Sequence, residues 1–169
     1  NYAFVYVDGT LTVSMAALTI TPADKTKTYL DANPALTVAY SGFKNSEDNT
    51  ALSIQPTVST TADANSEVGT YDITVVGADS ANYTIDQTAK GTLTVEQKGA
   101  TVTIANTSQT YNGSGLGVSA TPSINGLQVD VSYTLDGVAV TSPSNACSYA
   151  VTAAINDKNY TGTASDRLT

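Results

Sequence analysis

Hydrophobic and polar residues alternate along most of this chain. Leu18 and Ile20 alternate with Thr19 and Thr21, and the same period of two recurs in later segments. This period is typical of a β-strand with one buried face, because successive side chains of a strand point to opposite sides. The pattern predicts four further buried rows: Leu36, Val38 and Tyr40; Tyr71, Ile73 and Val75; Val129, Val131, Tyr133 and Leu135; and Tyr149, Val151, Ala153 and Ile155.

Turn-forming pairs separate these rows. They are Asn33-Pro34, Ser41-Gly42, Asn112-Gly113, Asn125-Gly126 and Asp136-Gly137. Asp136-Gly137 lies between two alternating segments and predicts a two-residue β-hairpin.

Residues 45–55 have no period of two. A polar start at Ser46 with Asp48 or Asn49 predicts a short helix here, so that the first half of the chain has the order β-β-α-β-β-β. The second half has no counterpart of this helix, and "GLQVDVSYTLDGV" supplies two extended runs instead.

The chain repeats a set of landmarks in the same order. "LTIT" at 18–21 corresponds to "VTIA" at 102–105, "KTY" at 27–29 to "QTY" at 109–111, and "GTYDITV" at 69–75 to "CSYAVTA" at 147–153. Asn-Tyr occurs at 1–2, 82–83 and 159–160. We therefore predict two tandem modules, at 14–95 and 96–169.

Residues 1–13 are predicted to be the closing strand or hairpin of a preceding repeat, since "GTLTV" at 9–13 recurs at 91–95. An isolated hairpin is seldom stable in water. We therefore expect residues 1–13 to dock on the first module or to pair with the sheet edge of another chain.

Composition and charge exclude several classes of partner. The chain is rich in residues that favour strands, and only 13% of it is charged, with a net charge of −8. Such a chain repels nucleic acid and anionic membrane surfaces. No run of apolar residues is long enough to insert into a membrane. The chain has one cysteine and begins with Asn, and we expect it to be a piece of a longer protein.

The segments "LTITPADKTKTYLDANPALTVAYSGF", "VGTYDITVVGADSANYTI" and "GTLTV" resemble the MBG-type repeats of large bacterial surface adhesins. "ATVTIANTSQTYNGSG" and "SNACSYAVTAAINDKNYTGTA" resemble the sister repeat of that group. This family is described as mucin-binding and β-grasp-like. The resemblance therefore implies a β-grasp-like fold, a tandem array and an extracellular location on the bacterial cell surface. The chain departs from that pattern at Leu30 and Cys147, where the family favours Gly.

The predicted fold is therefore mainly β, in two small tandem modules. We expect the first module to be β-grasp-like, with one short helix. For the second module, a β-grasp-like fold without a helix and an immunoglobulin-like sandwich both remain open.

The residues give little support for catalysis. The chain has no His, and Cys147 has no Lys or Arg within several positions, so neither a Ser-His-Asp nor a Cys-His arrangement is expected. We predict no enzyme activity, no catalytic residue, no cofactor and no metal site. Ca²⁺ binding by "DANP" at 31–34, "SEDN" at 46–49 or "DAN" at 63–65 is the alternative for the carboxylates, which otherwise lie in solvated turns.

Tyrosines recur at equivalent places in both modules, and we predict that they pack with the ring inside and the hydroxyl bonded at the rim. The pairs are Tyr29 and Tyr111, Tyr71 and Tyr149, and Tyr83 and Tyr160. A binding role for Tyr2, Phe4, Tyr6 or Phe43 is the alternative.

The predicted function is that of a structural spacer in a cell-surface adhesin, which projects a binding region from the cell. Its expected partners are the neighbouring repeats of the same chain. The alternative is an adhesion module that itself binds host mucin glycans or a matrix or surface protein.

Overall fold

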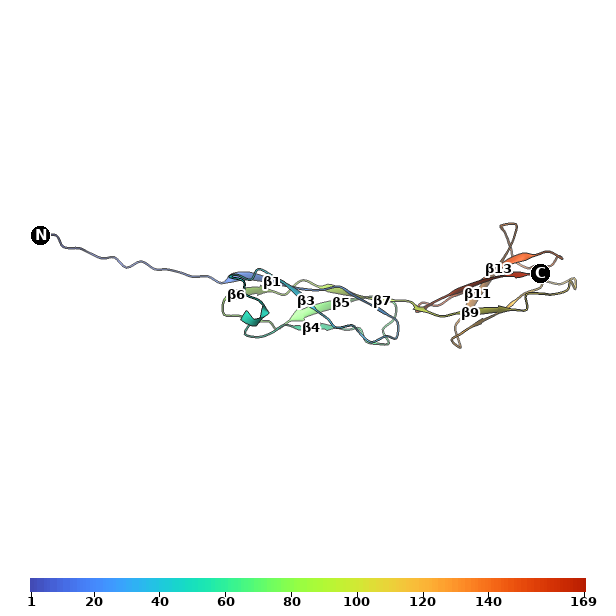
Figure 1. Cartoon of the computed structure of the whole chain (residues 1–169), viewed down its shortest axis with the longest axis horizontal. Coiled ribbons are helices and arrows are strands. Elements are labelled where there is room, and N and C mark those ends of the chain that lie inside the picture. The colour runs from blue at the N-terminus through green and yellow to red at the C-terminus, as the bar shows by residue number, and fades with distance from the viewer. The chain divides into compact units, whose positions relative to one another are not determined.

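The computed structural model describes residues 1–169, which form β-strands and one short 3-10 turn (Figure 1). The chain divides into two compact units. Unit 1 contains residues 1–25, 35–61 and 71–93, and unit 2 contains residues 26–34, 62–70 and 94–169.

A three-stranded sheet in unit 1 has β1 at its centre, and Figure 1 shows its strands side by side. The strands are β1 (Ala16–Pro22), β3 (Val38–Ser41) and β6 (Tyr83–Asp86). β1 pairs antiparallel with β3, where Ile20 lies opposite Tyr40, and parallel with β6, where Ala16 lies opposite Tyr83.

A four-stranded sheet has the order β2-β7-β5-β4. Its strands are β2 (Lys25–Thr28), β4 (Thr57–Thr60), β5 (Gly69–Val76) and β7 (Gly91–Glu96). β4 and β5 are antiparallel, with Val58 opposite Val75.

The predicted buried rows form the core of unit 1. The buried members of this core are Leu18, Ile20, Leu52, Val75 and Tyr83. Burying a side chain of this size stabilises a fold by about 1.5–3 kcal/mol. The rows predicted from Leu18 and from Tyr71 are thus confirmed as strands β1 and β5.

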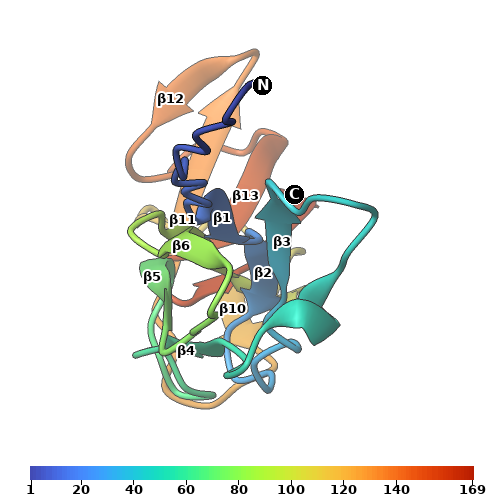
Figure 2. The same ribbon diagram turned by 90° about the vertical axis from the view of Figure 1, so that its left-hand side faces the viewer.

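The short helix expected in residues 45–55 is one 3-10 turn at Asn49–Ala51, seen in teal in Figure 2. The Asp48 carboxylate caps it by accepting hydrogen bonds from the Thr50 N–H at 2.9 Å and the Thr50 hydroxyl at 2.6 Å. These hydrogen bonds lower the pKa of Asp48. The turn is too short to cover a sheet, but it places Leu52 in the core.

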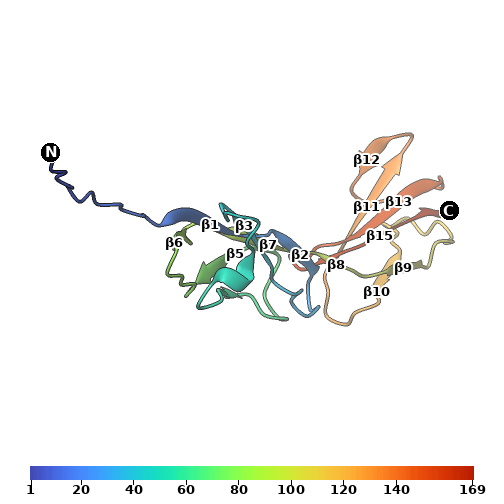
Figure 3. The same cartoon turned by 60° about the vertical axis from the view of Figure 1, so that its left-hand side comes forward.

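Unit 2 contains a two-stranded and a four-stranded sheet, with the orders β10-β9 and β12-β11-β13-β15, and a short parallel pair, β14-β8 (Figure 3). The strands are β8 (Lys98–Gly99), β9 (Val102–Ala105), β10 (Ser119–Pro122), β11 (Val129–Leu135), β12 (Val138–Val140), β13 (Tyr149–Ile155), β14 (Tyr160–Thr161) and β15 (Thr163–Leu168). As predicted, the second repeat has no helix.

The core of unit 2 is small. Its buried members are Tyr149, Val151 and Leu168, against which Ile104, Val131 and Tyr133 pack. The hairpin predicted at Asp136-Gly137 joins β11 to β12, and both residues have positive φ, at 50° and 81°. Positive φ at both central positions is typical of the turn that matches the twist of a hairpin.

Residues 1–13 form no strand and do not dock on the first module, so the first of the two alternatives was wrong (Figure 1). Pairing with the sheet edge of another chain stays a prediction. Tyr2 is 96% exposed and Leu11 is 89% exposed. Their counterparts in the first repeat, Tyr83 and Leu93, are 3% and 0% exposed.

Leu30 lies in the left-handed region, with φ at 68°. A side chain costs about 1–2 kcal/mol in that region, where glycine is tolerated. We predict that Leu30→Gly raises the free energy of unfolding by about 1 kcal/mol, because the Leu30 side chain is 42% exposed and contributes little burial.

Urea unfolding measures this effect, and Leu30→Ala is the matched control. Alanine removes the same side chain but keeps the strain, so it should not stabilise the chain. If alanine and glycine have equal effects, backbone strain at this position is not the cause.

Candidate functional site

The structure confirms the packing role of two of the recurring tyrosines. Tyr83 and Tyr149 are each 3% exposed. The Tyr83 hydroxyl donates a hydrogen bond to Glu47 at 2.5 Å and accepts one from the Lys44 N–H at 2.9 Å. The bond to the Glu47 carboxylate raises the pKa of Tyr83. The Tyr149 hydroxyl lies 3.2 Å from the Asn145 carbonyl oxygen.

The pair Tyr29 and Tyr111 differs between the repeats. Tyr29 is half-buried and contacts Tyr160 edge-to-face, with the ring centroids 5.5 Å apart. Tyr111 is 60% exposed, so the prediction of a buried ring was wrong for this residue. The same residue type therefore has a partner ring in one repeat and lacks one in the other.

Two carboxylates of the candidate Ca²⁺ loops, Asp48 and Asp63, accept hydrogen bonds within their own turns. Asp63 Oδ1 accepts hydrogen bonds from the Asn65 N–H and the Ser66 hydroxyl at 2.9 and 3.2 Å. Nowhere do three acidic, Cys or His side chains gather in a way that could hold a metal ion. Cys147 is exposed just before β13, and no feature of its surroundings marks a nucleophile.

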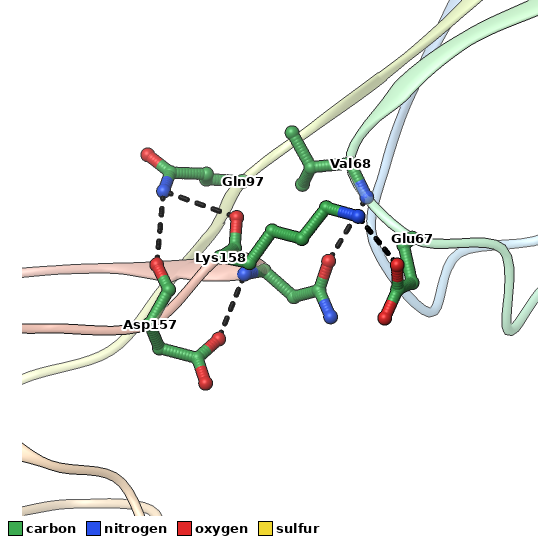
Figure 4. A network of polar contacts seen from close by, with 6 residues as sticks. Glu67, Val68, Gln97, Asp157 and Lys158 are labelled. Carbon is green, nitrogen blue, oxygen red and sulfur yellow. Dashed lines mark hydrogen bonds and ion pairs between the residues drawn. The ribbon is translucent and has the colours of Figure 1, made fainter.

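Four segments of unit 2 meet at what we call the joint: residues 26–34 and 62–70 on one side, and residues 97–100 and 157–161 on the other. The second side is held together by the parallel pairing of β8 with β14. The Lys98 N–H donates to the Asn159 carbonyl at 2.9 Å, and the Ala100 N–H donates to the Thr161 carbonyl at 2.8 Å. The Gln97 amide adds bonds to the Asp157 and Lys158 carbonyls (Figure 4).

The two sides of the joint contact each other through Asn159 and its neighbours. The Val68 N–H donates to Asn159 Oδ1 at 2.9 Å, and Lys158 pairs with Glu67 at 2.5 Å (Figure 4). A second ion pair joins Lys98 to Asp31 at 3.3 Å. Both ion pairs are solvent-exposed and contribute at most about 1 kcal/mol each. The hydrogen bond from the Val68 N–H to the Asn159 side chain and the Tyr29–Tyr160 ring contact are the uncharged contacts of the joint.

A buried lysine shapes the first side of the joint, and it was missed by the sequence analysis. Lys27 is 6% exposed, and its ammonium group donates to the backbone carbonyls of Asp31 and Asp63. It thereby ties residues 26–34 to residues 62–70. The available clue was its position in the KTY landmark, where the second repeat has Gln109, another long donor. Gln109 bonds the Asn106 and Gly117 carbonyls at 2.7 and 2.8 Å.

The structure has a pocket in each unit. The pocket in unit 2 has a volume of about 340 Å³ and is lined by residues that include Tyr111, Asn145, Ala146, Tyr149 and Leu168. The pocket in unit 1 has a volume of about 320 Å³ and is lined by residues that include Met15, Ala16, Glu47, Ala81 and Asn82.

Two family models match the chain. The model described as "MBG domain (YGX type)" matches residues 18–94, and the model described as "MBG domain" matches residues 100–169. No curated protein and no solved structure matches the chain.

We predict that Asn159→Ala weakens the joint, because the Val68 N–H then loses its acceptor. Loss of such a bond costs about 1 kcal/mol, so exchange of the Val68 amide hydrogen should become at least about fivefold faster. Hydrogen exchange followed by NMR measures it. Asn156→Ala is the control, since Asn156 bonds Asp130 outside the joint. Unchanged exchange at Val68 in the Asn159 variant would contradict the role assigned to this bond.

Proposed function

Because the chain belongs to the MBG domain family, we propose that it is a structural spacer of a bacterial cell-surface adhesin, which projects a binding region from the cell. MBG domains are associated with surface adhesin-like proteins, are typical of extracellular surface proteins and are not enzymatic families. None of the helical segments here has the length and apolarity that a membrane span requires.

The observation that carries the proposal is that the repeated tyrosines and Asn159 serve packing and contacts between repeats. Tyr83 and Tyr149 pack in cores, and Tyr29, Asn159 and Tyr160 contact one another or the backbone across the joint. In our proposal, the modules are residues 14–95 and 96–169, residues 1–13 are the closing strands of a further repeat, and each module has the neighbouring repeats as its partners. Contacts between neighbours add to the stability of each unit in such an array.

The proposal also explains the surface charge. The chain has 15 Asp and Glu against 7 Lys and Arg, which gives a net charge of −8. A net negative charge keeps an extended, exposed array soluble and discourages its association with other copies.

A spacer assay on bacteria tests the proposal. A carbohydrate-binding head of known specificity is displayed on zero, one or three tandem copies of residues 1–169, on cells coated with a polymer layer of graded thickness. We expect the thickness that still permits adhesion to grow with copy number, by about 25 Å or more per repeat from the size of a compact domain. Arrays without the head should not adhere; adhesion by headless arrays would contradict the spacer function.

Direct adhesion to host mucin glycans or a matrix protein is the second candidate. The pocket that holds the exposed ring of Tyr111 favours it, because aromatic rings at the edge of a pocket suit ligand contact. A binding screen of residues 1–169 on mucin glycans and matrix proteins, with Tyr111→Ala as the control, supports this candidate only if binding occurs and the variant abolishes it.

A further inference from the structure

We propose that the pocket at Tyr111 is a docking site for the amino-terminal edge of another repeat of the first type, formed by the counterparts of Met15, Ala16, Ala81 and Asn82. The proposal rests on the spacer function and specifies which repeat follows the second one. It is carried by a comparison of this pocket with the joint.

The pocket shares landmarks with the first side of the joint. The KTY and QTY landmarks make Lys27 the counterpart of Gln109 and Tyr29 the counterpart of Tyr111. The strands β5 and β13 make Val68 the counterpart of Ala146, and Glu67 that of Asn145. Lys27 and Gln109 each tie their loop to two backbone carbonyls. Their acceptors differ, since Lys27 reaches residues 62–70 and Gln109 reaches Asn106 and Gly117. The landmarks that the pocket shares with the first side of the joint are therefore the tyrosine and the segment before the core strand.

The docking groups of the pocket lack partners. Tyr29 contacts Tyr160, whereas Tyr111 has no ring partner and is 60% exposed. The Val68 N–H donates to Asn159, whereas the Ala146 N–H donates no hydrogen bond. The Ala146 N–H and the Tyr111 ring thus lack partners, although the equivalent groups in the joint, the Val68 N–H and the Tyr29 ring, have them.

The first repeat has the matching edge. The parallel pairing of β1 with β6 is the counterpart of β8 with β14, so Ala16 corresponds to Lys98 and Asn82 to Asn159. The Asn82 side chain is exposed and makes no hydrogen bond. It is the expected acceptor for the Ala146 N–H. Tyr83 points into its own core, so Met15, which is 51% exposed, is the side chain available to contact Tyr111.

Charge decides which type of edge fits. In the joint, Lys98 and Lys158 face Asp31 and Glu67. In the pocket, the counterparts of these two carboxylates are Gly113 and Asn145, which carry no charge. At the edge of the first repeat, Ala16 and Ala81 replace the two lysines. Uncharged residues therefore face each other at both positions where the joint has ion pairs, and the two types of repeat are expected to alternate.

Two fusions of the complete chain test the proposal. In the first, residues 13–169 follow Thr169 directly, so that Val13 takes the place that Val95 has after the first repeat. In the second, residues 95–169 follow Thr169 instead, so that the edge that carries Lys98 and Lys158 faces the pocket. Amide hydrogen exchange at Ala146 of the first copy and the accessibility of its Tyr111 ring are measured by NMR, with residues 1–169 alone as the reference.

We expect the first fusion to slow exchange at Ala146 by at least about fivefold, as a new hydrogen bond from its N–H to the Asn82 side chain would, and to cover Tyr111. Asn82→Ala in the added copy should return Ala146 to its reference rate, whereas Asn82→Ala in the first copy should have no effect. This matched pair separates docking from a failure to fold, because both variants carry the same substitution.

Unchanged exchange at Ala146 in the first fusion would overturn the proposal, as would protection that appears only in the second fusion. These outcomes leave the spacer function intact, because headless arrays would still fail to adhere. Binding of a glycan through Tyr111, by contrast, would contradict both proposals.

Discussion

The short parallel pairing of β8 with β14 is the contact on which the organisation of unit 2 depends. It binds residues 98–99, which directly follow the first repeat, to residues 160–161, near the end of the second. The pairing places Asn159 and Tyr160 beside residues 26–34 and 62–70. A connection of a few residues would otherwise be free in solution. Instead, residues 98–99 pair with β14, and the Gln97 amide donates to the Asp157 and Tyr160 carbonyls of the same segment.

The joint explains why the compact units do not coincide with the matched family regions. Residues 26–34 and 62–70 lie within the first family match, yet they belong to unit 2. Lys27 ties these loops to each other, and Asn159, Tyr160 and Lys158 contact them from the second repeat. The loops therefore gain contacts from a neighbour that an isolated repeat lacks. Small modules have little core of their own, so such contacts matter more to them than to larger domains.

The sequence predicted the strands well because burial imposes a period of two on residues such as Leu18, Ile20 and Val151. It also predicted the hairpin at Asp136-Gly137, and Leu30, which departs from the Gly of the family pattern, has positive φ. It did not predict the joint, because Lys27, Glu67 and Lys158 are far apart in the chain and follow no period. Nor did it predict that Tyr111 is exposed while Tyr29 contacts another ring. The two residues belong to equivalent landmarks, which do not indicate which of them has a ring beside it.

A double-mutant cycle at Tyr29 and Tyr160 tests the central claim most directly, that the repeated landmarks join neighbouring repeats. The free energy of unfolding of residues 1–169 is measured for the unmodified chain, for Tyr29→Ala, for Tyr160→Ala and for the double variant. We predict a coupling of about 0.5–1.5 kcal/mol, as expected for an edge-to-face ring pair. Effects that add within about 0.3 kcal/mol would show that the rings do not interact, and would contradict the account.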